Sequence, residues 1–343
     1  MERTLRTAVR KDPAARKVIA AWRRLTGGSE MRDKDRRTLI ACSGGADSSA
    51  LAIILAAATD NLTVCHILHD LRPEKAAKAD RDTARRLTRT LGLPFTSRSA
   101  AVLRLPGNAE ANARVIRYEL LARVARAKGC VAIATAHHAD DQAETVLMRL
   151  IRGSGPAGLR GVRESRPGPL RLRIVRPMLG VSRDDAERIC RIAGHRWATD
   201  ATNTDTTRLR AAVRARVLPV LRELSPNVSL ALTRAAVVQA DAALLIRQRA
   251  KALVAAARQR ESGLELPGKL LSRQPAAVLV QLIRVMYHRV VGTEGARSLT
   301  GMTLAPVLRA VRARSPRRVV ITVGRCRFEA TPTRLAVRPL PPA

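Results

Sequence analysis

Residues 43–48, with the sequence SGGADS, bring together two hydroxyls, a carboxylate and a flexible backbone. They follow the apolar residues 38–40 and precede the apolar run 51–55, so they are expected to form a turn between a strand and a helix. Adjacent glycines let the backbone adopt positive φ and approach a ligand closely, and the amides that open a helix attract anions. A tight turn with Asp47 as the helix N-cap is the alternative. The favoured interpretation is a phosphate cradle formed by Ser43, Gly44, Gly45, Ala46, Asp47 and Ser48.

A second group of reactive side chains lies in residues 136–145, AHHADDQAET. This pattern is typical of a strand end that turns into a helix. Asp140 and Glu144 are four residues apart and therefore share one helix face, next to His137 and His138. Ordinary capping accounts for one carboxylate, because acidic residues favour helix N-termini. Two carboxylates on one face indicate a site for Mg²⁺ or for an amine.

An α/β alternation must position both groups. From residue 37 onward, short apolar runs alternate with helical periods, which predicts a buried parallel sheet with helices on both faces. Ligands bind such sheets at the carboxyl ends of the strands, where both groups are expected. The expected strands are 37–43, 62–69, 94–100 and 130–137, and the expected helices are 47–58, 74–92, 108–128 and 139–152.

The alternation ends near residue 222. Before that point come a loop rich in glycine and proline at 153–169, a strand at 172–177 and a helix with Ser182 as its N-cap. Residues 227–260 then have the pattern of one long amphipathic helix. We therefore expect an open, mainly parallel α/β sheet followed by a smaller, mostly helical C-terminal domain. The predicted limits are a basic N-terminal extension at 1–35, a catalytic domain at 36–222 and a C-terminal domain at 223–343.

Composition points to a polyanionic partner. The 343 residues carry a formal charge of +35, which attracts nucleic acid; a general preference for Arg is the alternative explanation. Aromatic residues make up only 2% of the chain, so rows of stacking rings are not expected. Five scattered cysteines form no C-x-x-C pair, which favours reduced thiols of a cytoplasmic protein. No window of eighteen uncharged apolar residues exists, so no membrane span is expected.

The SGGADS segment contains neither Gly-Lys-Ser/Thr nor G-x-G-x-x-G. The string S-G-G-x-D-S resembles instead the pyrophosphate loop (PP-loop) of the N-type ATP pyrophosphatases, which cleave ATP between the α and β phosphates. Within that superfamily, residues 37–222 resemble the tRNA(Ile)-lysidine synthetases. The matching segments are HDLR (69–72), ARVIRYELL (113–121), AHHADDQAETVLMRLIRGSGPAGLRGV (136–162), RPML (176–179) and WATDATNTDTTRLRAAVRARVLPVL (197–221).

This resemblance implies the fold of the PP-loop ATPases, with ATP and Mg²⁺ as cofactors. It implies free L-lysine and tRNA(Ile) with a CAU anticodon as substrates, and it leaves room for a homodimer. Mg²⁺ would bind Asp47. The catalytic residues would be Asp47, Asp140, Glu144, His137 and Arg117; His69 and Arg72 would join the cradle in binding the nucleotide; and Arg149, Arg152, Arg210 and Arg214 would contact the tRNA.

Three positions depart from the family pattern, and two of them, Ala211 and Pro156, affect details of the substrate gate. Asp70 replaces the usual Gly, Ala211 replaces the usual Asn, and Pro156 stiffens the Gly-rich loop. A tRNA 2-thiolating enzyme of the same superfamily is the nearest alternative, but those enzymes need cysteines that are commonly in C-x-x-C. A non-catalytic basic RNA-binding relative is the second alternative. It would have no reason to keep the loop and the carboxylates together.

Overall fold

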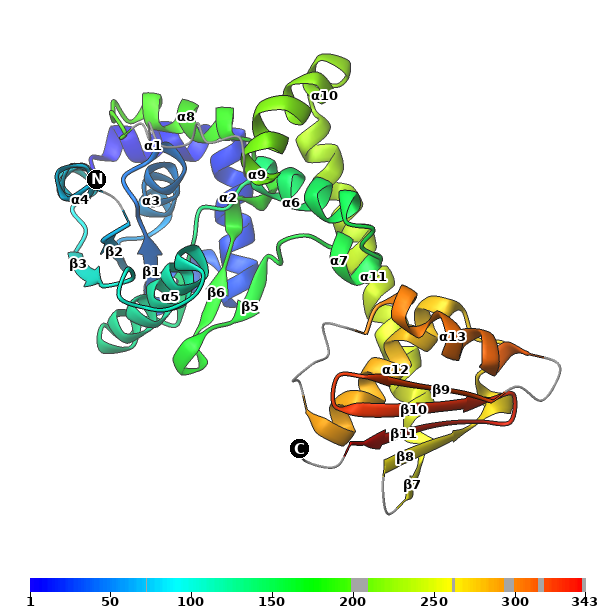
Figure 1. Ribbon diagram of the computed structural model, residues 1–343. Helices are drawn as coiled ribbons and strands as arrows, with labels where there is room; N and C mark the ends of the chain where they lie inside the picture. The colour runs from blue at the N-terminus through cyan, green and yellow to red at the C-terminus, as the bar shows by residue number, and fades with distance from the viewer. Residues whose placement is uncertain (72, 199–208, 261–262, 293–298, 314–317, 341–343) are drawn as a thin grey trace. The chain divides into compact units, whose positions relative to one another are not determined.

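The computed structural model covers residues 1–343 and describes all of them except 72, 199–208, 261–262, 293–298, 314–317 and 341–343 (Figure 1). The described chain divides into two compact units. The first comprises Met1–Ser154 and Gly158–Val237, and the second comprises Gly155–Ala157 and Val238–Ala343. The domain limits expected from the sequence, after residues 35 and 222, remain predictions.

The first unit contains a six-stranded sheet made of β1 (Thr38–Ala41), β2 (Leu62–His69), β3 (Phe95–Ala100), β4 (Ala132–Ala134), β5 (Ser165–Pro167) and β6 (Arg173–Val175). Its order is β3-β2-β1-β4-β6-β5. β1 pairs in parallel with both β2 and β4, while the edge strand β5 is antiparallel to β6. The expected open, mainly parallel sheet is confirmed. β1 lies at its topological switch point, where open α/β sheets bind ligands.

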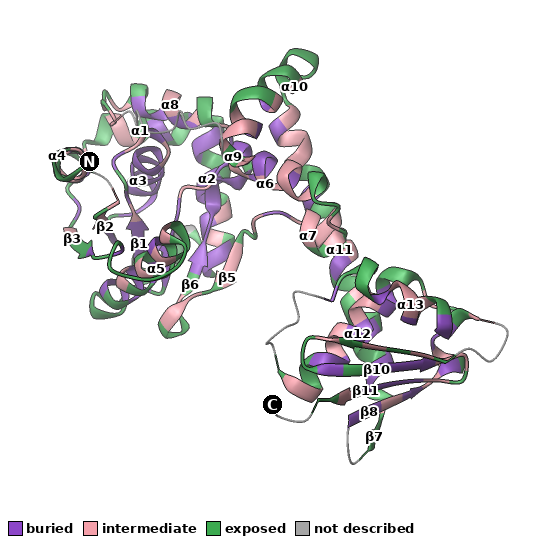
Figure 2. Ribbon diagram, in the orientation of Figure 1, coloured by how far each residue is buried: buried purple, intermediate pink, exposed green. Residues whose placement is uncertain are grey.

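The helices that cover this sheet include α3 (Ala46–Ala58), α4 (Glu74–Leu91) and α5 (Ala109–Ala127), and α6 (Ala139–Ile151) follows β4. Successive strand residues point to opposite faces, so Ile40 packs in the core that contains α3, whereas Leu39 packs against apolar residues of α5. Every residue of α3 except Asp47 is buried (Figure 2). This interior helix therefore presents one charged side chain, in its first turn.

Two helices at the N-terminus, α1 (Arg3–Lys11) and α2 (Pro13–Thr26), pack on the same core as α3. Asp12 caps α2 by accepting two backbone N–H groups. Trp22 is fully buried, and its indole N–H donates to Thr38 Oγ1 at 3.0 Å. The sequence analysis expected a solvated basic extension here instead. The many arginines of this segment concealed an amphipathic pattern whose apolar face is buried.

The connection from α6 to the second unit is built from short helical pieces and one long helix. Ser182 accepts the Asp185 N–H at 3.1 Å, and the Asp185 carboxylate accepts the Ser182 N–H at 2.9 Å. This capping box confirms the helix start expected from the sequence. The elements are α7 (Pro156–Leu159), α8 (Arg183–Ile192), α9 (Leu209–Ala212), a π-helical turn (Val213–Val217), α10 (Leu218–Leu224) and α11 (Val228–Ala255).

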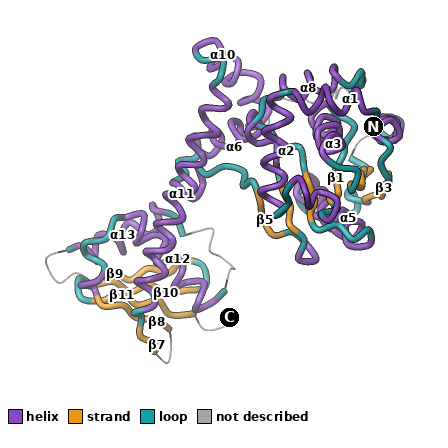
Figure 3. Tube along the Cα trace, turned by 180° about the vertical axis from the view of Figure 1, so that it is seen from behind, coloured by secondary structure: helices purple, strands orange, loops and turns teal. Residues whose placement is uncertain are grey.

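The second unit contains an antiparallel sheet and two main helices (Figure 3). Tyr287 and Phe328 stack in its core with ring centroids 6.4 Å apart. The sequence pattern predicts helices at 275–291 and 299–313 and β segments near 317–324 and 333–338, whereas the strands at 258–260, 263–267 and 326–331 were not expected. The elements are β7 (Arg258–Arg260), β8 (Gly263–Pro267), α12 (Ala276–Val291), α13 (Gly301–Arg312), β9 (Val319–Val323), β10 (Cys326–Thr331) and β11 (Arg334–Pro339), with the sheet order β7-β8-β11-β10-β9.

Among the described residues, α11 is the one helix that is long and apolar enough to cross a membrane by length and composition alone. Arg234 and Asp241 lie within its apolar run. Charged side chains inside a membrane span are costly. A single helix of this kind is weak support for a membrane span.

Replacing Trp22 by Ala is expected to lower the free energy of unfolding by about 3–5 kcal/mol, because the change leaves a large cavity beside α3. Chemical denaturation followed by circular dichroism measures this loss. Arg16→Ala is the matched control, because Arg16 is exposed on the same helix and should change stability by less than about 0.5 kcal/mol. Equal midpoints for the two variants would show that α2 does not support the core.

Candidate active site

The turn that follows β1 is held in shape by its own serines. The Ser43 N–H donates to Ser48 Oγ at 3.0 Å, and Ser48 Oγ donates to the Gly45 carbonyl at 3.1 Å. Gly44 has φ +92°, and a Cβ at this position would lie 2.6 Å from the Asp80 carbonyl oxygen. A side chain there would be strained in both respects. The turn is therefore a preformed loop.

Among the described residues, no side chain caps the amides that open α3. Gly45 is the N-cap, and it makes no side-chain cap hydrogen bond, so Asp47 is not the cap. Amides in this position bind phosphate oxygens. Asp47 lies in the first turn, and its buried Oδ1 has no hydrogen-bond partner among the described residues. A ligand or an ion would complete it.

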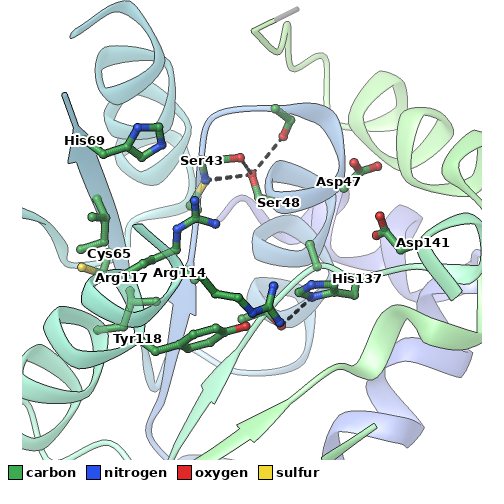
Figure 4. Close-up of a pocket in the computed structure, with 17 residues that line it drawn as sticks. Ser43, Asp47, Ser48, Cys65, His69, Arg114, Arg117, Tyr118, His137 and Asp141 are labelled. Atoms are coloured by element: carbon green, nitrogen blue, oxygen red, sulfur yellow. Dashed lines mark hydrogen bonds between the residues drawn. The ribbon is translucent and has the colours of Figure 1, made fainter. Parts of the chain in front are cut away.

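A cavity of about 480 Å³ opens beside this loop, where β1, β2 and β4 end (Figure 4). Gly44 and Ala46 are buried within the loop. Arg72, expected to bind the nucleotide, lies outside the described residues. The residues expected from the sequence that do line the cavity are Ser43, Gly45, Asp47, Ser48, His69, Arg117 and His137.

Sequence reasoning missed several other residues of the lining. Arg114 precedes Arg117 by three positions on α5 and so falls on the same helix face. That spacing is a signal from which Arg114 could have been found. Asp140 was predicted as a site residue and its neighbour Asp141 was not. Successive side chains on a helix point about 100° apart, so the two carboxylates face different surroundings. The residues with polar, charged or sulfur-containing side chains that were missed are Cys42, Cys65, Arg114, Tyr118, Thr135 and Asp141.

Asp140 shares one face of α6 with Glu144, as expected, but it does not line the cavity. Its carboxylate accepts hydrogen bonds from Arg222, at 2.7 Å, and from the Ser229 hydroxyl. Burial opposes ionisation of Asp140, but these two hydrogen bonds outweigh it and lower the pKa below the ordinary value. Asp140 therefore fastens the chain around the start of α11 to α6.

Glu144 also does not line the cavity, and it is only 1% exposed. Arg214 Nε donates to Glu144 Oε1 at 2.6 Å, and Arg210 Nε lies 3.1 Å from Oε2. Two guanidinium groups thus neutralise a carboxylate that would be costly to bury alone. The assignment of Asp140 and Glu144 to a lysine pocket remains a prediction, and both carboxylates already hold arginines of this chain.

Of the four arginines expected to contact tRNA, three already interact with other groups of this chain. Arg210 and Arg214 bind Glu144, and Arg149 donates to the carbonyl of Gly161 at 2.9 Å. Arg152, at the end of α6, is exposed. Their contacts with RNA remain predictions.

His137 lines the cavity and is neutral near pH 7. Its Nδ1 lies 3.1 Å from Thr135 Oγ1. Burial lowers the pKa of His137 to about 4, against the opposing effect of the Asp141 charge. The ring can therefore accept a proton but does not carry one at rest.

His138 links the loop helix α3 to α6. Its Nδ1 accepts the Asp140 N–H at 3.2 Å as the N-cap of α6, so the ring proton belongs on Nε2, which lies 3.4 Å from Asp47 Oδ2. Burial lowers the pKa of His138, but the hydrogen bond to Asp47 and the charge of Asp141 raise it more. The cap needs a free lone pair on Nδ1, so the neutral tautomer fits the geometry.

Opposite charges line opposite walls of the cavity. Asp47 and Asp141 lie on the side of α3 and α6, whereas Arg114, Arg117 and Tyr118 project from α5 (Figure 4). The cavity can therefore bind phosphate and a cationic group at the same time.

A family profile described as a PP-loop domain matches residues 16–221. A tRNA(Ile)-lysidine synthase of Salinispora tropica is 41% identical over 256 residues, which cover 72% of this chain and 73% of that protein. The chain belongs to the tRNA(Ile)-lysidine synthases of the PP-loop family. Another member, from Symbiobacterium thermophilum, is 36% identical over 332 residues, and these cover 87% of this chain and 66% of that protein.

A solved structure supports the same fold. The U34-tRNA thiolase NcsA of Methanococcus maripaludis, with its [4Fe-4S] cluster, has a TM-score of 0.54 with this chain at 18% identity. The similarity covers 66% of this chain and 78% of the thiolase. At that identity, the comparison concerns the fold alone.

Membership of the PP-loop family implies use of ATP. Mg²⁺ usually binds nucleotide phosphates together with one or two carboxylates. Within the described parts of the chain, no group of three or more His, Cys, Asp and Glu side chains could hold a metal ion by itself. An Mg²⁺ ion that is bound mainly by phosphates needs only one or two carboxylates. Asp47 fits this need, because its Oδ1 lies beside the loop and has no hydrogen-bond partner among the described residues.

Gly44→Ala is expected to lower the free energy of unfolding by about 1–3 kcal/mol, because its positive φ and the nearby Asp80 carbonyl both resist a Cβ. Gly45→Ala is the matched control. Its φ is −76°, and a Cβ would have its nearest neighbour, Ser43 Oγ, at 3.7 Å, so the loss should stay below about 1 kcal/mol. Urea denaturation compares the two variants. Equal losses would contradict the conformation of the loop.

The imidazole of His137 is expected to titrate near pH 4 in the folded protein, as measured by NMR of labelled histidine with His137→Gln for assignment. Because the unfolded chain takes up this proton near pH 6.5, stability should fall as the pH drops from about 6.5 towards 4. His137→Gln should remove this part of the pH dependence. A titration midpoint near 6.5 would contradict the buried, neutral ring.

Proposed function

We propose that this chain joins free L-lysine to C2 of the wobble cytidine of tRNA(Ile) with a CAU anticodon, while ATP becomes AMP and pyrophosphate. The observation that carries the proposal is the cavity in which the loop after β1 meets Asp47 and Asp141 on one wall and Arg117 on the other. The names of the relatives support the choice of substrates. The modified tRNA would read AUA and accept isoleucine, and the reaction would take place in the cytoplasm.

The first step would adenylate the tRNA. The C2 oxygen of cytidine attacks the α-phosphorus of ATP, the bond from that phosphorus to the bridging oxygen breaks, and pyrophosphate leaves. The amides of α3 and the serine hydroxyls of the loop would hold the leaving group. Arg117 shares a second, smaller pocket with Ser43 and His69, which supports a role for it in binding the α-phosphate. Mg²⁺ held by Asp47 would offset the phosphate charge.

The second step would use the acidic wall. Asp47 and Asp141 attract the side-chain ammonium of lysine, which would pass one proton to solvent before its nitrogen attacks C2. As the C–N bond forms, the nitrogen becomes more acidic, so the neutral ring of His137 or the carboxylate of Asp141 can take the next proton. The C2–O bond then breaks, and AMP leaves.

In this scheme Asp140 and Glu144 would act mainly as anchors. Direct binding of lysine by either would require Arg210, Arg214 or Arg222 to release it. Asp141, which faces the cavity, would supply the second carboxylate of the amine site.

The chemistry of the cysteines argues against tRNA thiolation. All five are buried, and burial raises the pKa of the Cys65 thiol to about 12. Sulfur transfer needs a thiolate. The cavity cysteines are instead expected to be inert packing groups.

The assay combines the full chain, ATP, lysine and tRNA(Ile) transcript with CAU, and measures AMP and modified nucleosides by mass spectrometry. Lysidine and AMP should form together, and omission of lysine or of the tRNA should abolish lysidine. Asp47→Asn should lower kcat by about 100-fold or more, because the amine loses a carboxylate and Mg²⁺ loses a ligand. Asp184→Asn, an exposed change on α8, should have no effect. Tight tRNA binding without AMP would favour a non-catalytic RNA-binding protein.

A further inference from the structure

The α5 wall of the cavity carries two arginines, and only one of them has a role in binding the nucleotide in the proposed reaction. Arg114 and Arg117 both line it, and no carboxylate among the described residues forms an ion pair with either. Arginines that face a cavity without an acidic partner are candidates for binding an anionic ligand.

The two arginines serve different parts of the cavity. Arg117 approaches the loop after β1, where it also lines the smaller pocket with Ser43 and His69. The Arg114 guanidinium lies over the Tyr118 ring, 5.4 Å from its centroid, and its charge acts on His137. Figure 4 shows Arg114 on the side of Tyr118 and His137. Arg117 is thus matched with phosphate, and Arg114 is left for a second anion.

Two further arginines contact Tyr118, the ring over which the Arg114 guanidinium lies. Arg166 lies over the Tyr118 ring, 4.5 Å from its centroid, and Arg176 interacts electrostatically with the Tyr118 phenol. Arg176 is only 2% exposed, and its Nε has no hydrogen-bond partner among the described residues. Burial tends to raise the pKa of the Tyr118 phenol, but the charges of Arg176 and Arg114 outweigh it and lower the pKa. The buried Arg176 and the half-buried Arg166 thus hold the Tyr118 ring, over which the exposed Arg114 guanidinium lies.

We propose that Arg114 binds the α-carboxylate of the free amino acid whose side-chain ammonium is held by Asp47 and Asp141. The inference rests on the proposed function and adds a specificity site to it. Lysine carries its carboxylate and its side-chain ammonium at opposite ends, and the cavity carries the complementary charges on opposite walls. A diamine of the same length would match one wall and meet repulsion at the other. Arg114 would thereby select an amino acid over a polyamine.

Phosphate is a weaker candidate for the same arginine. The hydroxyls and free amides that suit phosphate belong to Ser43–Ser48 and the start of α3, and Arg117 adjoins them. Arg114 instead lies by Tyr118 and His137, so binding to the α-phosphate would leave the carboxylate of the amino acid without a cation.

The test compares Arg114→Ala with the wild-type chain using lysine and pentane-1,5-diamine, which lacks the carboxylate. For lysine, KM should rise about 10- to 100-fold, the loss expected for a hydrogen bond to a charged group. KM for the diamine should stay level or fall, so the preference of the wild type for lysine should largely disappear. Pyrophosphate release from ATP and tRNA without lysine should change less than about threefold, because that step precedes amino-acid binding.

Two further variants separate binding from folding. Arg114→Lys should restore part of the affinity for lysine, since a cation is kept. Arg123→Ala removes an exposed arginine from the same helix and should leave both KM values unchanged. Unfolding midpoints establish that each variant is folded.

Three results would overturn the inference. An unchanged preference for lysine over the diamine in Arg114→Ala would show that Arg114 does not bind the carboxylate. Slower pyrophosphate release with an unchanged KM for lysine would assign Arg114 to phosphate. A wild-type chain that forms no lysidine would defeat the proposed function itself, and this inference with it.

Discussion

The parallel pairing of β1 with both β2 and β4 is the constraint on which the site depends. It puts the carboxyl end of β1 in the middle of the sheet, so the chain must turn sharply there and enter a helix that covers the sheet. That helix, α3, is buried along its whole length apart from Asp47. A single carboxylate and a set of free amides therefore meet at one point, and neither can shift without disturbing the core.

Around the carboxyl end of β1, the carboxylates that face the cavity are separate from those that form ion pairs with arginines. The carboxylates that face the cavity, Asp47 and Asp141, are close to the neutral ring of His137 and to His138, whose Nε2 lies 3.4 Å from Asp47 Oδ2. The carboxylates of α6 that face the other way are neutralised by arginines. One helix thus supplies both a ligand-facing acid and two structural acids, because its side chains turn by about 100° per residue.

The fold and the loop could be predicted from local sequence patterns, whereas the directions in which individual side chains point could not. Alternating apolar runs indicated β1 to β4 and their helices, and Ser182 with Asp185 marked the start of α8. The arginine-rich helices α1 and α2 were missed, because net charge outweighed the buried stripe that includes Trp22. Asp140 and Glu144 were correctly placed on one helix face, but the arginines that cover this face come from residues 210–222, about 70 to 80 positions away in sequence.

The ion pairs along α6 also shape the electric field of the protein. Arg210, Arg214 and Arg222 are matched there by an equal number of nearby carboxylates on α6, so this neighbourhood adds almost nothing to the total of +35. On the α5 side, Arg114 and Arg117 line the cavity, and neither forms an ion pair with a carboxylate among the described residues. An approaching polyanion would thus be attracted more strongly to the α5 rim of the cavity than to the α6 rim. Its direction of approach would depend on which arginines are paired with carboxylates, and not on the net charge of the chain.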